Sequence, residues 1–414
     1  MIFLRKMGAK TITFPAKILK VLSALFTAKG RLFLELRLRA RWPGFYLAIA
    51  GIYRATFARH QRVIIVIGSL GKTTTTRATL RAFHLPEGRV LENANNGYSL
   101  AAAFMGVPLR QKIVVLEVGI SSPGAMRPLT KPLRPDCIVF TSVAMEHIFS
   151  FRDIAHIAEE KATALMALRP GGRVVINGDD PLVRAAVARY AVPVTTFGYD
   201  ADNDFRGLSW SLDWPAGSRM RLVSDGLEHE LETELLSQVS SYALLAAWAT
   251  AHVCGQADEV TRRGLTGLPA SPGRLQRVAT PSGAWILRDD FKSTYETIHL
   301  ALDVLAKLPG RRIVVIGGID AAPDPQKNAY ETIARRIGEI ADELVLVLGT
   351  WHNYYKPEFN RQLRSDSRLG KVTVVRSTAE AIAALRGRLG PGDVVLIKGR
   401  SNERMGEVAQ GLSV

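Results

Sequence analysis

The stretch VIIVIGSLGKTTTT, from Val63 to Thr76, constrains the fold more than any other part of the chain. Its β-branched run Val63–Ile67 predicts a buried parallel strand, and the turn Gly68–Gly71 follows it. Lys72 and four threonines then begin a helix that we expect to reach Leu80. Glycines let the backbone N–H groups of such a turn point at an anion, and the helix N-terminus adds the positive end of its dipole. This order of elements predicts a phosphate-binding loop.

The side chains after the turn predict what this loop binds. Lys72 would reach the β- and γ-phosphates of a nucleotide, and Thr73 would offer its hydroxyl to Mg²⁺. The alternative is an ordinary turn rich in small residues, which the Gly-Lys-Thr sequence after a β-branched strand disfavours. The loop differs from the general P-loop because Val66 and Ile67 directly precede its first glycine. The predicted nucleotide contacts are Gly68, Ser69, Gly71, Lys72, Thr73 and Thr74.

Length and charge divide the chain into unlike parts. Its 414 residues, 47% of them apolar, are enough for two or three globular domains. The net charge of +16 is uneven, because residues 1–62 hold thirteen Lys and Arg residues and one acid, Glu35. Cys137 and Cys254 lie in apolar stretches and are interpreted as free thiols in a reducing cytosol. We therefore expect a cytoplasmic protein with a nearly neutral body and a basic N-terminal extension.

The N-terminal extension, residues 1–62, predicts helices that combine basic and apolar residues. Pro15–Lys29 has amphipathic periodicity, Arg31–Arg41 alternates leucine with arginine, and Gly44–Tyr53 is an apolar run too short to span a bilayer. Such a segment suits the anionic inner face of the cell membrane as a peripheral partner. An equally weighted alternative is a helical collar packed on the next domain, with its arginines solvated. Nucleic acid is disfavoured because no recognised reading motif accompanies the charge.

Strand and helix patterns alternate through the rest of the chain and predict an α/β protein of two domains. The first, residues 63–272, would contain a central, mostly parallel P-loop sheet, with a β-meander inserted over residues 201–235. Ser271–Gly273 is interpreted as a linker, and residues 273–414 predict a C-terminal Rossmann-like α/β domain. The expected strands are Val63–Ile67, Lys112–Val118, Cys137–Thr141, Arg173–Ile176, Val194–Phe197, Trp285–Arg288, Arg312–Ile316, Leu344–Leu348, Val372–Val375 and Val394–Lys398.

Three polar side chains follow the P-loop at positions where a site is expected. Glu117 ends the second strand, His147 follows the third, and Lys161 lies on the next helix. Parallel sheets place their sites at the carboxyl ends of strands, where a carboxylate could ligate Mg²⁺ beside the P-loop. A single histidine is more often structural and a single helix lysine more often solvated. The interpretation of Glu117, His147 and Lys161 as site residues therefore depends on their order after the P-loop.

Six motifs in this order resemble those of the Mur ligase superfamily: GSLGKTTTT, LENANNGYSL, LEVGISSPG, EHIFSF, AEEKATAL and VINGDDP. The resemblance continues through SPGRLQRV, LRDDFKSTYETIHLALDVL and GDVVLIKGRSNERMGEV, and the nearest branch is MurF. It implies an ATP-dependent ligase of peptidoglycan and cell-wall synthesis that joins a carboxylate to an amine through an acyl phosphate. The MurF branch adds D-alanyl-D-alanine to a UDP-muramoyl tripeptide. The combination of motifs is specific for the superfamily, whereas each motif alone is not.

The resemblance also implies roles for individual residues. Lys72, Lys161 and His147 would be the catalytic residues. Two Mg²⁺ ions would be held by Thr73, Glu117, His147 and a carbamate formed on Lys161. Beyond the P-loop, ATP would contact Asn177, Asp180, Arg274 and Asp290, with Arg274 at the phosphates and Asp290 at the ribose. The two substrates would contact Asn95, Asn96, Lys398 and Arg400.

Four departures from the family pattern affect substrate recognition more than the ATP site. The basic extension stands in place of the family's N-terminal UDP-binding domain. Ile148 replaces a glutamate, and Ser121-Ser122 replace Asn-His. The stretches that meet adenine also differ, because Asp290–Tyr295 replaces Asp-x-Tyr-Asn-x-Asn and Gln238–Tyr242 replaces His-Asn-x-x-Asn. We therefore expect an ATP-and-metal core with altered contacts to the base.

The sequence thus predicts a Mur-type ligase whose carboxylate substrate is lipid-linked or polymeric, at the membrane face. MurF activity itself, with the extension as a replacement first domain, is the first alternative. A non-catalytic nucleotide-binding partner of a membrane assembly is the second. The set Lys72, Glu117, His147 and Lys161 disfavours this second alternative, because binding alone has no need of a carbamylation lysine.

Overall fold

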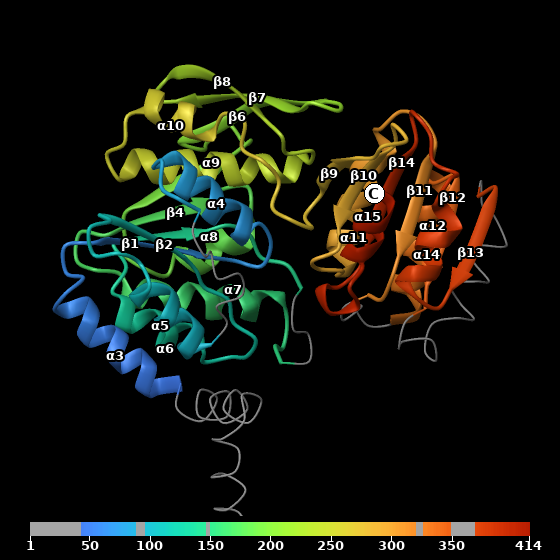
Figure 1. The fold of residues 1–414 in the computed structure, drawn as a ribbon. Coiled ribbons are helices and arrows are strands. Elements are labelled where there is room, and N and C mark those ends of the chain that lie inside the picture. The colour runs from blue at the N-terminus through green and yellow to red at the C-terminus, as the bar shows by residue number, and fades with distance from the viewer. Residues whose placement is uncertain (1–42, 88–95, 146–149, 320–325, 349–368) are drawn as a thin grey trace, which may run out of the picture.

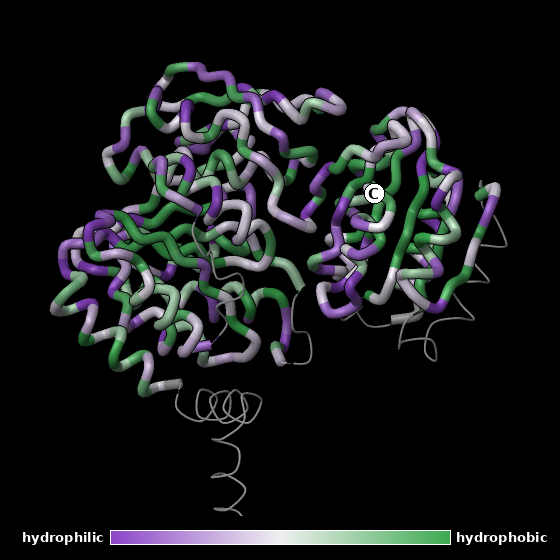
Figure 2. The backbone as a smooth tube through the Cα atoms, viewed as in Figure 1, coloured by the Kyte–Doolittle hydropathy of each residue, from purple (hydrophilic) through white to green (hydrophobic). Residues whose placement is uncertain are grey.

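The structure is a computed structural model that describes residues 43–87, 96–145, 150–319, 326–348 and 369–414. These residues form two α/β domains, a central domain and a C-terminal domain, which lie side by side in Figure 1. The apolar strands form the interior of both domains, as the green segments of Figure 2 show. Some predicted features lie outside the described residues: the helix over Pro15–Lys29, the Arg31–Arg41 segment, Asn95 and His147.

The central domain is built on an eight-stranded sheet in the order β2-β1-β3-β4-β5-β6-β7-β8. The strands from β2 to β6 run parallel. Strand β7 pairs antiparallel with β6, and β8 pairs antiparallel with β7, which gives the predicted meander. The strands are β1 (Arg62–Ile67), β2 (Ile113–Glu117), β3 (Cys137–Phe140), β4 (Arg173–Asn177), β5 (Val194–Gly198), β6 (Phe205–Asp213), β7 (Gly217–Ser224) and β8 (Leu227–Thr233).

Helices cover both faces of this sheet, as the β-branched pattern of β1 requires. Val63, Ile65 and Ile67 enter one buried cluster, whereas Ile64 and Val66 enter another on the opposite face. A strand that is apolar on both sides needs such a double cover. The helices are α3 (Pro43–Ala55), α4 (Lys72–Ala82), α5 (Gly97–Met105), α6 (Met126–Thr130), η1 (Lys131–Leu133), α7 (Ile154–Ala162), η2 (Thr163–Ala167), α8 (Pro181–Val187), α9 (Gln238–Val253) and α10 (Asp258–Leu265).

The C-terminal domain is a six-stranded sheet in the order β13-β12-β11-β14-β10-β9, with helices on both faces. All five predicted strands form and run parallel, while β9 (Gln276–Ala279) is an additional antiparallel edge strand. The remaining elements are β10 (Trp285–Asp289), α11 (Tyr295–Ala306), β11 (Arg312–Ile316), α12 (Gln326–Ile340), β12 (Glu343–Val347), β13 (Lys371–Val375), α14 (Thr378–Leu385), β14 (Val394–Lys398), η4 (Ser401–Glu403) and α15 (Gly406–Leu412).

The described part of the N-terminal extension packs on the central domain. The apolar run Gly44–Tyr53 lies within α3, which contacts α5 and η1. Leu47 and Ala50 are buried in the same cluster as β1. Arg54 is also buried, so this arginine is not solvated as the collar alternative supposed. Within the described ranges, no helix is long and apolar enough to cross a bilayer.

Candidate active site

The turn after β1 has the geometry of an anion-binding loop. Gly68 has φ = 140°, and a Cβ there would lie 2.0 Å from the Thr141 hydroxyl of the neighbouring β3 loop. Gly71, at the N-cap of α4, is left-handed with φ = 79°. Both positions favour glycine, because other residues rarely adopt these conformations. Lys72 then opens α4, so the loop amides lie at a helix N-terminus as the sequence predicted.

Thr73 and Glu117 meet at the carboxyl ends of β1 and β2. The Thr73 hydroxyl donates a 2.7 Å hydrogen bond to Oε2 of Glu117, and both side chains are buried. Val66 and Glu117 are partners in the sheet, so β1 and β2 fix this distance. Hydroxyl and carboxylate oxygens suit Mg²⁺, and the pair therefore fits one metal beside the loop. No cluster of three His, Cys, Asp or Glu side chains suited to a metal occurs among the described residues.

Two lysines bring their amines to the same loop. Nζ of Lys72 donates to the Ser69 carbonyl at 2.9 Å. Lys161, on α7, is 1% exposed and donates from Nζ to the Gly68 carbonyl at 2.7 Å. The structure therefore brings Lys161 to the P-loop although it lies far along the chain. A solvated helix lysine, the alternative at this position, is excluded by its burial.

Arg274, at the start of the C-terminal domain, contacts the helix that follows the P-loop. Its Nη2 donates to the Thr73 hydroxyl oxygen at 3.2 Å, and its guanidinium lies 4.3 Å from the centre of the Phe291 ring. The Ser271 hydroxyl, at the linker, accepts a 2.7 Å hydrogen bond from Arg77 of α4. The predicted linker thus holds Arg274 against the same threonine that contacts Glu117.

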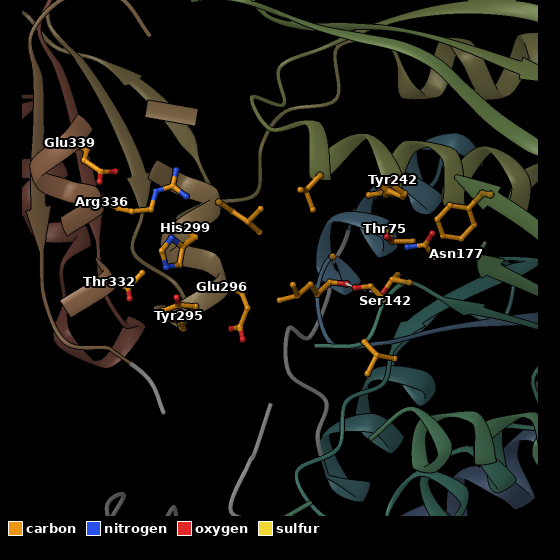
Figure 3. Close-up of a pocket in the computed structure, with 18 of the residues that line it drawn as sticks. Thr75, Ser142, Asn177, Tyr242, Tyr295, Glu296, His299, Thr332, Arg336 and Glu339 are labelled. Atoms are coloured by element: carbon orange, nitrogen blue, oxygen red, sulfur yellow. Dashed lines mark hydrogen bonds between the residues drawn. The ribbon is translucent and has the colours of Figure 1, made fainter. Parts of the chain in front are cut away.

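Two adjoining cavities open around these groups. The P-loop cavity, of about 140 Å³, is lined by the loop, Glu117, Arg274, Asp289 and Lys292. The interdomain pocket, of about 850 Å³, lies between α9 and the ends of β3 and β4 on one side and α11 and α12 on the other. Residues common to both linings show that the cavities adjoin: Leu70, Gly71, Val239, Ala243 and Leu300. Figure 3 shows the two walls of the interdomain pocket facing each other.

A hydrogen-bonded network holds Tyr242 in the central-domain wall. Its hydroxyl donates to Oδ2 of Asp179 at 2.8 Å, and Asp179 also accepts from Asn203 and from the backbone N–H groups of Tyr199 and Asp200. Burial raises the pKa of Tyr242, and its bond to Asp179 adds to this effect. For Asp179, burial alone would raise the pKa, but the four hydrogen bonds outweigh it and lower the pKa. Tyr242 is therefore a neutral, fixed aromatic wall.

The opposite wall carries His299 on α11. Its ring lies 4.4 Å from the Tyr295 ring, centre to centre, in an edge-to-face arrangement. Burial lowers the pKa of His299, and Arg336 of α12 lowers it further. Both His299 and Arg336 line the interdomain pocket (Figure 3). This wall therefore presents a neutral imidazole beside a guanidinium.

Three predicted residues of the C-terminal domain are held by ion pairs. Asp290 pairs with Arg288 at 3.0 Å and does not line the P-loop cavity, whereas the preceding Asp289 does. Lys398 is 1% exposed and donates to Asp289 at 2.5 Å and to the Lys292 carbonyl at 2.7 Å. Arg400 pairs with Glu403 at 2.7 Å and lines neither cavity.

Three predicted residues of the central domain fall at element ends. Asn177, at the end of β4, lines the interdomain pocket, and its Oδ1 accepts from the Asp179 N–H at 3.1 Å. Asp180 caps α8 and accepts from the Val143 N–H at 2.8 Å, so it ties the loop after β3 to that helix. Asn96 caps α5 by accepting from the Ser99 N–H at 2.9 Å. Asn177 faces the pocket, and the other two hold loops in place.

Sequence reasoning missed Asp289 and Tyr242, which line the cavities, and Asp179, which accepts a hydrogen bond from Tyr242. Asp289 stands beside Asp290 and both are buried, so only their partners, Lys398 and Arg288, distinguish them. Tyr242 lies in the stretch Gln238–Tyr242, for which the sequence predicts altered contacts to the base, and its aromatic side chain is the signal for a pocket wall. Asp179 is the first acid of the VINGDDP motif, whereas the resemblance implies a role only for the second, Asp180.

Known proteins share the sequence and the domain order of this chain. A sequence profile of the Mur ligase middle domain matches residues 66–251, and one of the Mur ligase glutamate ligase domain matches residues 273–401. A UDP-N-acetylmuramoyl-tripeptide–D-alanyl-D-alanine ligase of Bacillus subtilis is 25% identical over 85% of this chain and 76% of its own length. The Mycobacterium tuberculosis protein of the same name is 25% identical over 84% of this chain and 72% of its length.

Solved structures share the fold. MurF ligase from Thermotoga maritima in complex with ADP superimposes with a TM-score of 0.75 at 21% identity, over 90% of this chain and 83% of that one. Mycobacterium tuberculosis folylpolyglutamate synthase complexed with ADP and AMPPCP gives 0.68 at 16% identity, over 94% and 99%. The fold and site define a two-domain P-loop α/β protein. With both domain profiles matched over most of its length, the chain belongs to the Mur ligase family, whose members among its relatives are named ligases.

Proposed function

We propose that the protein is an ATP-dependent ligase that forms an amide bond between a carboxylate and an amine. The observation that carries the proposal is the convergence of Glu117, Arg274 and the P-loop on the Thr73 hydroxyl. Glu117 ends β2 and the P-loop leads into α4, whereas Arg274 belongs to the C-terminal domain, so both domains contribute to one phosphate-sized cavity. The adjoining interdomain pocket offers room for a nucleoside between Tyr242 and the His299 wall.

The proposed reaction has two steps. An oxygen of the substrate carboxylate attacks the γ-phosphorus of ATP, the bond to the β–γ bridging oxygen breaks, and ADP leaves. The amine then attacks the carbonyl carbon of the acyl phosphate, loses a proton, and expels inorganic phosphate. In this proposal Lys72 and Arg274 bind the transferring phosphoryl group, where cationic side chains stabilise the charge that develops.

Metal ions belong to the same proposal. Thr73 and Glu117 would hold one Mg²⁺, which would neutralise negative charge on the phosphates when bound. A second Mg²⁺ would involve His147, which lies outside the described residues. Lys161 is proposed to be carbamylated, because its amine lies buried against the P-loop, where an anionic ligand would serve a metal better than a cation.

The substrates are proposed from the relatives and from the chain's own extension. The first relatives are named for ligation of D-alanyl-D-alanine to a UDP-muramoyl tripeptide, and we propose a related peptidoglycan precursor as the carboxylate. The matched profiles begin at residue 66, and the residues before it are strongly basic. We therefore favour a lipid-linked or polymeric form of that precursor at an anionic membrane, with the soluble UDP-linked tripeptide as the alternative.

Phosphate release from ATP across a panel of carboxylates and amines tests the ligase proposal. The panel includes the UDP-muramoyl tripeptide and its lipid-linked form, each with D-alanyl-D-alanine and with single amino acids. We expect release only when both partners are present, and mass spectrometry should find the amide product. Lys72→Ala should abolish turnover, while Lys112→Ala, an exposed lysine beside β2, should not. Turnover of Lys72→Ala within tenfold of wild type would contradict the P-loop assignment.

A further inference from the structure

Helix α3 presents apolar side chains outward as well as inward. Leu47 and Ala50 are buried against the central domain. On the other side, Phe45, Ile49 and Ile52 are 58%, 37% and 64% exposed. Surface helices ordinarily bury an apolar stripe and expose charged residues, so a helix that is apolar on both sides is expected to be covered on both sides.

The single charged residue of α3 points inward. The Arg54 guanidinium donates to the carbonyls of Leu133, Ala58 and Gln61 and pairs with Asp136 at 2.8 Å. Arg54 thereby ties α3 to η1 and to the start of β1. The contacts fix the rotation of α3, and this rotation leaves its apolar residues facing outward.

The exposed apolar surface continues beyond the helix. Phe57 is 65% exposed, and Leu109 is 40% exposed on a loop whose carbonyl contacts His60. We call Phe45, Ile49, Ile52, Phe57 and Leu109 the α3 patch. Exposed apolar residues that gather on one helix and its neighbouring turns mark an interaction site more often than scattered ones do.

Basic residues and no exposed acids accompany the α3 patch. Residues 43–62 contain no Asp or Glu, and residues 97–135, which supply α5, α6 and η1, contain only Glu117, which is buried in the site. The exposed basic residues of these stretches include Arg59, Arg110, Lys131 and Arg134. The chain immediately before α3 adds ten Lys and Arg residues and one acid over residues 1–42.

We propose that the α3 patch docks on an anionic phospholipid bilayer. Covering the patch with residues 1–42 would bring two basic surfaces together, whereas anionic lipid complements both of them. Lipid also accepts exposed aromatic and aliphatic side chains at the interface, which a nucleic acid backbone does not. Figure 1 places α3 on the far side of the central domain from the C-terminal domain, so docking leaves the interdomain pocket open to solvent.

Vesicle co-sedimentation of the full chain tests this inference, which is independent of ATP turnover. Wild type should bind phosphatidylcholine vesicles that contain phosphatidylglycerol and bind pure phosphatidylcholine much less. Ile52→Glu/Phe57→Glu places two acids on the patch and should weaken binding to anionic vesicles by on the order of tenfold or more. Leu227→Glu is the matched control, because Leu227 is also 65% exposed but lies on β8 at the opposite end of the domain.

A second variant keeps the test decisive if the first misfolds. Arg59→Glu/Lys131→Glu changes exposed residues and should weaken binding to anionic vesicles while leaving the circular dichroism spectrum unchanged. Wild-type binding that is absent, or that both double variants retain, would overturn the proposal. Displacement from vesicles by duplex DNA, with DNA binding that both variants lose, would instead assign the patch to nucleic acid.

Discussion

Lys398, the last residue of β14, donates a 2.5 Å hydrogen bond to Asp289, its partner in register at the end of β10. The same amine donates to the Thr297 hydroxyl of α11 at 3.2 Å. A buried ammonium with these partners fixes the three elements that form the C-terminal wall of the P-loop cavity. Asp289 lines that cavity, so Lys398 acts on the site through it.

Replacing Lys398 should therefore lower the free energy of unfolding, with a smaller effect on substrate binding. Lys398→Met leaves the Asp289 carboxylate without its cation, and breaking one side of a buried ion pair costs about 3–5 kcal/mol. Urea unfolding followed by circular dichroism measures the loss. Lys371→Met, an exposed lysine on β13 of the same sheet, is the control. A stable Lys398→Met variant with a raised KM for the amine would restore the substrate role that the resemblance implied.

Glu117→Gln should raise the Mg²⁺ concentration needed for turnover. The amide keeps the size of the side chain and can still accept a hydrogen bond from Thr73, but it removes the negative charge that favours the metal. We expect the half-saturating Mg²⁺ concentration to rise by at least about tenfold, because a charged ligand becomes neutral. Glu228→Gln, on exposed β8, controls for the general loss of a carboxylate. An unchanged Mg²⁺ dependence would remove Glu117 from the metal site.

Lys161→Ala should lose activity and regain part of it when acetate or formate is added. The removed side chain leaves space beside Gly68, and a small carboxylate there would replace the anionic carbamate. Lys161→Arg keeps a cation and forms no stable carbamate, so it should be inactive without rescue. If arginine supports turnover, the residue acts as a cation and the carbamate proposal fails.

Local hydrophobic patterns predicted much of this fold because the apolar positions of a strand are the ones that become buried. The run Val63–Ile67 is apolar on both sides and forms a central strand, and Gly68 and Gly71 adopt the backbone conformations that their positions suggested. The parallel order of strands then brings Glu117 to Thr73. The meander over residues 201–235 is likewise confirmed by β6–β8.

The residues that local patterns did not place are those whose partners lie far along the chain. Asp289 and Asp290 are equivalent in sequence, and only their contacts with Lys398 and Arg288 separate them. No local pattern indicated that Arg54 is buried, because Asp136, its partner, is remote in sequence. In each case a polar residue turned inward to satisfy a buried charge, which periodicity does not record.

His299 makes the stability of the protein depend on pH below neutrality. Burial and then Arg336 lower its pKa below the ordinary value of 6.5, while Asp303 opposes them and Arg335 assists. The unfolded chain therefore takes up a proton near pH 6.5, whereas the folded protein stays neutral until a lower pH. Between the two pKa values the unfolded state binds more protons, so His299 causes stability to fall as the pH decreases through this window.

His299→Gln does not titrate and should reduce that fall, measured as the urea midpoint from pH 7.5 down to about pH 5. His60→Gln, an exposed histidine of the central domain, serves as the control. Equal pH dependence in wild type and His299→Gln would show that the ring is solvated and that the wall of the pocket is open.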